Sequence, residues 1–190
     1  MTYLNFFPFC DKIISYRKEV RYMLHIYCGD GKGKTTAAAG LAVRASGAGI
    51  KCFFFQFLKN GDSSEIAQMK SLGIQVRSCT GARFTRLMTD EEKKLVTLRH
   101  NEMLSEACEL VRSGKAGLIV LDELLAAYSL GLADRELTAA LLDMKVSAEI
   151  IVTGRGPDDI FLSKADYITH MAAVKHPYTK GVQARKGIEY

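Results

Sequence analysis

Residues 24–45 read LHIYCGDGKGKTTAAAGLAVRA, and this stretch decides the fold. The apolar run from Met23 to Cys28 predicts a buried strand, whereas the Ala- and Leu-rich segment from Thr35 to Ala45 favours a helix. Between them lies a glycine-rich loop, Gly29-Asp30-Gly31-Lys32-Gly33-Lys34-Thr35-Thr36. A strand, a glycine-rich loop and a helix in this order form a P-loop, whose backbone N–H groups and helix N-terminus bind phosphate. The stretch therefore predicts a nucleotide-binding loop.

Two side chains of the loop carry the expected chemistry: Lys34 supplies a cation to phosphate, and the Thr35 hydroxyl can ligate magnesium. The first glycine of the usual G-x-x-x-x-G-K-[ST] pattern falls on Cys28, so the loop is one residue short and its phosphate cradle should differ in detail. We interpret Cys28 as a packed thiol. A dinucleotide fingerprint is excluded, because Lys34 replaces its last small residue and no acid follows the next strand.

Apolar runs alternate with helical stretches along the rest of the chain, which predicts an α/β fold with a mostly parallel sheet and helices on both faces. Further strands are expected at 51–57, 118–121 and 149–153, with weaker ones at 74–77 and 167–174. Thr89 and Glu92 form a capping box that starts a helix to about Ser113. Asp134 caps a helix through Leu142, and Pro157 fits the first turn of a short helix before Asp166.

Composition is that of an ordinary globular domain, with 48% hydrophobic and 25% charged residues in 190. We expect one domain over residues 23–190, while residues 1–22 are an N-terminal arm or an over-long start. The net charge of +5 mildly favours anionic ligands, but no basic stripe with interleaved aromatics indicates nucleic acid. No signal peptide, membrane span, disulfide framework or zinc motif is expected, so the predicted compartment is the cytoplasm.

Two further segments end in residues suited to nucleotide chemistry. Leu118-Ile-Val-Leu-Asp122-Glu123 is an apolar strand followed by two acids, the form of a Walker B segment. Asp122 is expected in the magnesium shell, and Glu123 shares that role or acts on bound water. Thr153-Gly-Arg-Gly156 closes another buried strand, and Arg155 is expected to meet nucleotide phosphate or ribose.

These segments, in this order, resemble the ATP:co(I)rrinoid adenosyltransferases of cobalamin synthesis and salvage. The resemblance covers residues 23–190 and includes Gln56-Phe-Leu-Lys59 and the tail VKHPYTKGVQARKGIEY at 174–190. It implies a RecA-like P-loop fold and a reaction in which a Co(I) corrinoid attacks the 5′ carbon of ATP and releases triphosphate. It also implies that the loop holds the terminal phosphate of a reversed ATP.

The resemblance implies roles for particular residues. Lys32, Lys34 and a magnesium ion held by Thr35 and Asp122 stabilise the charge on triphosphate, and no side-chain nucleophile is needed. In the loop after the third strand, Phe84 is a candidate for the corrinoid's lower face or an ordinary packing residue, whereas the family's tryptophan is replaced, we infer by Arg86. His170 and His176 are not expected to ligate cobalt. Implied partners are ATP, a corrinoid, a second subunit in a homodimer and an electron donor such as a reduced flavoprotein.

Two alternatives remain open at this point. One is a small P-loop phosphotransferase resembling a nucleoside kinase, which would form ADP instead of triphosphate. The other is a RecA-like nucleotide-dependent binding module acting on nucleic acid or protein, which would show steep salt dependence.

Overall fold

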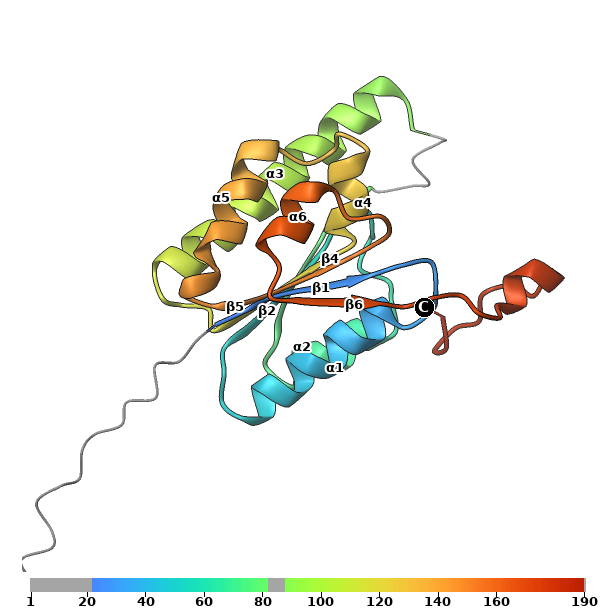
Figure 1. Ribbon diagram of the computed structural model, residues 1–190, viewed down its shortest axis with the longest axis horizontal. Helices are drawn as coiled ribbons and strands as arrows, with labels where there is room; N and C mark the ends of the chain where they lie inside the picture. Colours follow the sequence, from blue (N-terminus) through green and yellow to red (C-terminus); the bar gives the residue numbers. More distant parts are fainter. Residues whose placement is uncertain (1–21, 82–87, 190) are drawn as a thin grey trace, which may run out of the picture.

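The computed structural model of the protein describes residues 22–81 and 88–189, and its centre is a sheet of parallel strands (Figure 1). The strands in chain order are β1 (Leu24–Cys28), β2 (Cys52–Gln56), β3 (Gln75–Ser78), β4 (Leu118–Asp122), β5 (Glu149–Thr153) and β6 (Tyr167–His170). Their order across the sheet is β3-β2-β4-β5-β1-β6. Because all six run the same way, their carboxyl ends meet at one edge, where ligands bind in open α/β sheets.

Helices cover both faces of the sheet (Figure 1). On one face lie α1 (Lys34–Gly47) and α2 (Glu65–Ser71), packed through small and apolar residues such as Ala38, Ala42 and Met69. The other face carries α3 (Asp90–Arg112), α4 (Leu124–Ser129), α5 (Arg135–Asp143) and α6 (Asp159–Lys164). Short 3₁₀ turns follow at Met144–Val146 and Pro177–Lys180.

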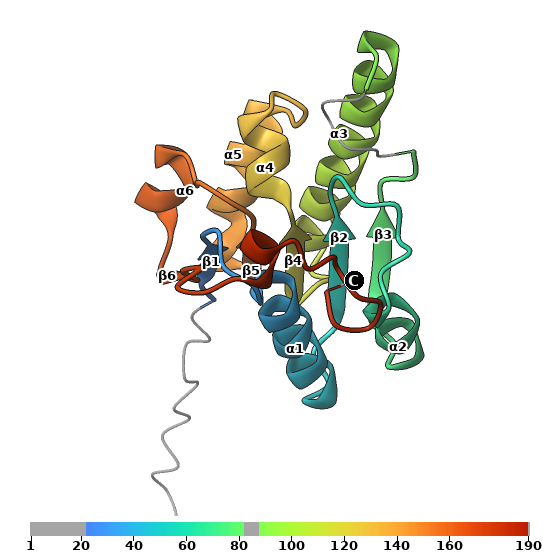
Figure 2. The same cartoon turned by 90° about the vertical axis from the view of Figure 1, so that its right-hand side faces the viewer.

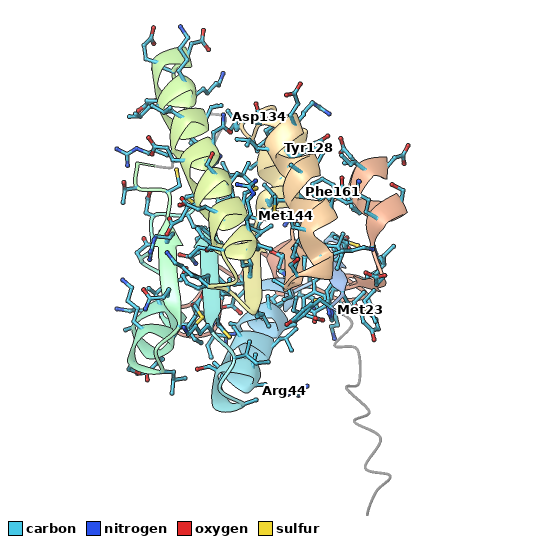
Figure 3. The ribbon with its side chains drawn as sticks, turned by 90° about the vertical axis from the view of Figure 1, so that its left-hand side faces the viewer. Met23, Arg44, Tyr128, Asp134, Met144 and Phe161 are labelled. Carbon is cyan, nitrogen blue, oxygen red and sulfur yellow. The ribbon has the colours of Figure 1, made fainter. Side chains whose placement is uncertain are left out.

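Aromatic packing stabilises the helix layer that contains α3, α4, α5 and α6. Tyr128 of α4 and Phe161 of α6 meet edge to face with ring centroids 5.0 Å apart (Figure 3). Phe161 is fully buried, and edge-to-face contacts of this kind add to the stabilisation from buried area. This packing holds α4, which begins directly after Asp122 and Glu123, against the sheet.

The expected α/β class, parallel sheet and helices on both faces are confirmed. The predicted capping box is present: Thr89 accepts from the Glu92 backbone, and the Glu92 carboxylate accepts from Thr89. The last strand is shorter than expected, ending at His170 because the Met171 carbonyl turns to accept from Gly31. Pro157 lies just before α6, whose N-cap is Asp158, and is not in its first turn. Helices α2 and α4 were not predicted.

The two buried clusters lie on opposite sides of the sheet, and β4 separates them with five buried residues. Strand residues alternate between the clusters, so Leu118 and Val120 face α1 while Ile119 and Leu121 face α3. The same alternation places Asp122 on the α1 face. Within residues 22–81 and 88–189 there is no helix with both the length and the apolarity that a membrane span requires.

Candidate nucleotide site at the carboxyl edge of the sheet

The predicted P-loop connects β1 to α1 at the carboxyl edge. Gly33, the N-cap of α1, has φ of 111°, a conformation that residues with a Cβ rarely adopt. This turn lets α1 begin at Lys34, so the first free N–H groups of the helix point into the loop. The Lys34 side chain is only 9% exposed, and its ammonium donates to the Gly31 carbonyl at 2.7 Å. Burial lowers the pKa of Lys34, with the carboxylates around it acting in the opposite direction.

Asp122 is the hub of the site. Its side chain is completely buried, and one carboxylate oxygen accepts from the hydroxyls of Thr35 at 2.8 Å and Thr153 at 2.7 Å. The other oxygen accepts from the Lys59 ammonium at 2.7 Å. The structure therefore brings together the P-loop threonine and the acid that were expected to share a metal ion.

Lys59 is absent from the predicted site residues, although it lies at the centre of the site. Its ammonium also donates to the Thr35 hydroxyl at 3.1 Å. Burial acts to lower the pKa of Lys59, but the charge and hydrogen bond of Asp122 outweigh it and raise the pKa. No local pattern in the sequence marks this role, because it depends on the pairing of β2 with β4 in the folded sheet.

A row of polar side chains crosses the ends of four neighbouring strands on the α1 face. Gln56 is aligned with Ser78 of β3 on one side and with Asp122 on the other, and Thr153 continues the row on β5. The Gln56 amide oxygen accepts from the Ser78 hydroxyl at 2.9 Å. Its amide nitrogen is buried and has no partner among the described residues. A buried donor without a partner is uncommon in a packed core, where most buried polar groups are hydrogen-bonded.

Glu123 and Arg155 flank this row. Glu123 has a left-handed backbone with φ of 63°, and its N–H donates to the Thr153 hydroxyl at 3.0 Å. Burial raises the pKa of Glu123, and the neighbouring Asp122 raises it further. Arg155 is exposed on the loop after β5. Its positive charge adds to the lowering of the pKa of Lys34 and partly opposes the raising of the pKa of Glu123. Left-handed backbone at a residue other than glycine is often found at functional sites.

The segment after β6 crosses the P-loop (Figure 2). The Gly31 N–H donates to the Met171 carbonyl at 2.7 Å, and a Cβ on Gly31 would lie 2.6 Å from that oxygen. Asp30 accepts from the Ala173 N–H at 3.2 Å, which lowers the pKa of this exposed carboxyl. Gly29 and Gly31 are thus required by close approach of a second backbone.

The same segment ends against Lys32. The Glu189 carboxylate accepts from the Lys32 ammonium at 3.0 Å and from the Arg185 guanidinium at 3.1 Å. Hydrogen bonds from Arg185 and then Lys32 lower the pKa of Glu189 to about 2. The Glu189 carboxylate therefore forms an ion pair with a lysine of the P-loop.

Two cavities flank the loop. One, of about 420 Å³, lies between α1, the segment after β2 and the C-terminal segment. Its lining is Thr35, Thr36, Ala39, Lys59, Ser63, Ser64, Glu65 and residues 187–189. The other, of about 410 Å³, lies between Lys32 and residues 172–185, with Glu189 lining both.

Comparison with known proteins identifies the family. The family model for ATP:corrinoid adenosyltransferase BtuR/CobO/CobP matches residues 20–190. The chain belongs to the ATP:corrinoid adenosyltransferase family. A corrinoid adenosyltransferase of Pseudomonas aeruginosa is 31% identical over 95% of this chain and 89% of its own length. The corrinoid adenosyltransferase of Escherichia coli strain K12 is 32% identical over 95% of this chain and 91% of its own.

A solved structure supports the fold independently. The KaiC-like protein PH0186 from Pyrococcus horikoshii superposes with a TM-score of 0.52 at 16% identity, covering 80% of this chain and 71% of that one. At this identity the likeness concerns the RecA-like P-loop fold only. It confirms the predicted fold class of this ATP:corrinoid adenosyltransferase family member.

The donor set at Asp122 fits a magnesium ion. Thr35 and Asp122 present hard oxygen ligands in contact with each other, and Mg²⁺ in nucleotide sites uses one or two such groups together with phosphate oxygens and water. Among residues 22–81 and 88–189, no group of three or more His, Cys, Asp or Glu side chains could hold a metal by itself. Thr35 and Asp122 would therefore supply part of the ligand set of a metal ion, and water or phosphate oxygens would supply the rest.

The structure leaves some predicted residues apart from this site or outside its description. Phe84 and Arg86 lie outside the described residues. The buried Cys28 thiol lies 3.9 Å from His170 Nδ1 and is packed beneath the loop. The remaining predicted loop residues, together with Asp122, Glu123 and Arg155, gather at the carboxyl edge of β1, β4 and β5.

Proposed function

We propose that the chain transfers the 5′-deoxyadenosyl group of ATP to the cobalt of a reduced Co(I) corrinoid and releases triphosphate. The observation that carries the proposal is the family match over residues 20–190, joined to a P-loop whose lysine, threonine and Walker B acid meet at one edge. The cobalt–carbon bond forms as the bond between C5′ and O5′ breaks. Cobalt supplies the electron pair and becomes Co(III), and triphosphate leaves with the other pair.

The chain's own groups bind and orient in this proposal. The loop N–H groups, Lys34 and the N-terminus of α1 would hold the terminal phosphate, with Lys32 and Arg155 adding positive charge along the polyphosphate. Thr35 and Asp122 would hold Mg²⁺, which neutralises charge on the leaving triphosphate when bound. The cavity beside Thr36 would receive another part of the nucleotide. Because cobalt is the nucleophile, alignment is the main task of the protein.

Glu123 directly follows Asp122 and flanks the proposed metal site. Burial and the neighbouring Asp122 raise the pKa of Glu123. Its place beside Asp122 suits it to share the shell of a bound metal ion or to act on bound water. We assign it a supporting role beside Asp122 and no direct part in bond formation.

Other features of the proposal come from the family resemblance. We propose residues 23–190 as the catalytic domain, residues 1–22 as an arm or an over-long start, and Phe84 as the contact to the lower face of the corrinoid. A homodimer in the cytoplasm and a reduced flavoprotein as electron donor complete the proposal. Sedimentation would test the dimer, and turnover from Co(II) with and without a reduced flavoprotein would test the donor.

The direct test is a reaction of protein, Mg-ATP and chemically reduced cobalamin. We expect a light-sensitive adenosylated corrinoid whose formation requires all three components. A protein that consumes ATP to ADP without forming this product would instead support the phosphotransferase alternative.

A further inference from the structure

The turn that follows β2 places Lys59 beside Asp122 at the carboxyl edge of the sheet. The Phe57 N–H donates to the Asp122 carbonyl at 2.9 Å, which extends the pairing of β2 with β4 by one bond. Leu58 then takes a left-handed backbone with φ of 55°, which is unusual for a residue with a branched side chain. Such a conformation persists only where the surroundings hold it in place.

His100 of α3 stabilises this conformation by accepting a hydrogen bond from the Leu58 N–H. Its ring is fully buried, and Nε2 lies 3.2 Å from the Leu58 N–H while Nδ1 lies 2.8 Å from the Leu132 carbonyl. Since Nε2 must accept, the proton belongs on Nδ1 and the ring is neutral. Burial lowers the pKa of His100 in keeping with this state. The strained turn that carries Lys59 is thus anchored from the opposite face of the sheet.

The Lys59 ammonium is the cation that balances Asp122. Asp122 is completely buried, whereas the Lys59 side chain is 26% exposed and lines the cavity beside Thr35. A buried carboxylate without a counter-charge is strongly unfavourable. The hydroxyls of Thr35 and Thr153 satisfy the other Asp122 oxygen but bring no charge.

The Lys59 ammonium therefore lies against the side-chain oxygens that would ligate a metal ion. It lies 2.7 Å from Asp122 Oδ2 and 3.1 Å from Thr35 Oγ1, the two groups that fit Mg²⁺. A metal ion bound to these two groups would lie close to the ammonium, and the two like charges would repel each other. The stem of Lys59 borders the cavity, so its ammonium can leave Asp122 and remain beside a bound polyphosphate.

We propose that Lys59 is a positioning residue that makes metal binding depend on the nucleotide. In the nucleotide-free protein its ammonium is the counter-cation of Asp122 and excludes a divalent ion. When a metal–ATP complex binds, the metal replaces it at Asp122, and Lys59 moves to a polyphosphate oxygen. This inference rests on the proposed ATP site but needs neither corrinoid nor turnover.

The test is Mn²⁺ binding to the nucleotide-free protein, followed by electron paramagnetic resonance of free Mn²⁺. Lys59→Met keeps the stem and removes the charge, and we expect it to bind Mn²⁺ at least about tenfold more tightly than the wild type. Lys70→Met, at an exposed lysine on α2, is the matched control and should change nothing. Equal or weaker Mn²⁺ binding by Lys59→Met would overturn the proposal.

Thermal unfolding provides a second readout that does not depend on a metal site. Lys59→Met should lower the unfolding midpoint in the Asp122 protein and have little effect in the D122N background, where no carboxylate needs a counter-cation. Added Mn²⁺ should restore the midpoint of the single variant. A loss of equal size in both backgrounds would assign Lys59 a packing role and refute the exchange.

If adenosyl transfer failed while the Mn²⁺-binding result and the unfolding result both held, the proposed reaction would be wrong and the cation exchange would stand. If adenosyl transfer succeeded while Lys59→Met bound Mn²⁺ no better than the wild type, the reaction would stand and the exchange would be wrong.

Discussion

Asp122→Asn is the substitution whose effect the structure defines most closely. It keeps the shape of a fully buried side chain and removes one negative charge. The amide oxygen can still accept from Thr35 and Thr153, but the amide nitrogen can no longer accept from Lys59. The variant therefore loses one charge-assisted hydrogen bond of 2.7 Å and leaves an ammonium without its anion.

The size of the loss follows from the exposure of Lys59. Breaking a fully buried ion pair costs about 3–5 kcal/mol. The Lys59 side chain is 26% exposed and can turn towards water in the cavity, which reduces this cost. We expect the free energy of unfolding to fall by about 2 kcal/mol, near the value of a charged hydrogen bond. For a chain of this size that corresponds to about 4–8 °C in the unfolding midpoint.

Urea unfolding of the nucleotide-free protein measures this loss, and the magnesium dependence of ATP binding measures the second consequence. We expect the variant to need more magnesium, since a charged ligand of the metal is lost. The control is Glu109→Gln, which removes one negative charge from an exposed position on α3 and keeps the shape of the side chain. It should leave both the stability and the magnesium dependence unchanged. Unchanged stability together with unchanged magnesium dependence would refute the placement of Asp122 at the hub.

Three further predictions concern the loop and its support. Lys34→Ala should weaken ATP binding by about 10- to 100-fold, as expected for loss of a charged hydrogen-bond donor, while circular dichroism stays unchanged; calorimetry that finds normal affinity would contradict the P-loop assignment. Gly31→Ala should cost about 1–3 kcal/mol of stability because its Cβ would lie 2.6 Å from the Met171 carbonyl, whereas Gly40→Ala on α1, with open space around it, should be neutral or stabilising. Burial lowers the pKa of His100 in the folded protein. Below about pH 6.5 the unfolded chain therefore binds a proton more readily than the folded chain, and the free energy of unfolding should decrease as the pH is lowered. His100→Gln should reduce the slope of stability against pH in that range, and an unchanged slope would show that other groups cause it.

The P-loop and the parallel sheet could be predicted because their signals are local. The run from Leu24 to Ala45 contains a strand, a loop and a helix directly one after another. Each of the other strands is visible as a short apolar run. Asp122 was predicted because it comes at the end of such a strand. Helix α2 was missed because its seven residues are too few to show a helical period, and α4 because it adjoins the apolar run of β4.

The role of Lys59 could not be predicted from local pattern. It depends on the pairing of β2 with β4, which are not neighbours in the sequence, and on a left-handed turn at Leu58 held by His100. The contact between Lys32 and Glu189 joins residues 157 positions apart and depends on where the segment after β6 crosses the loop. Contacts of this kind follow from topology, and only the folded chain reveals them.

The phosphorus product of ATP tests the central claim most directly. Protein, Mg-ATP and chemically reduced cobalamin are incubated in the dark, and ³¹P resonance is used to quantify the products against the adenosylated corrinoid. The account predicts one triphosphate for each cobalt–carbon bond formed, because the bond that breaks is between C5′ and O5′. ADP or inorganic phosphate in place of triphosphate would contradict it, since the bond broken would then lie between phosphates.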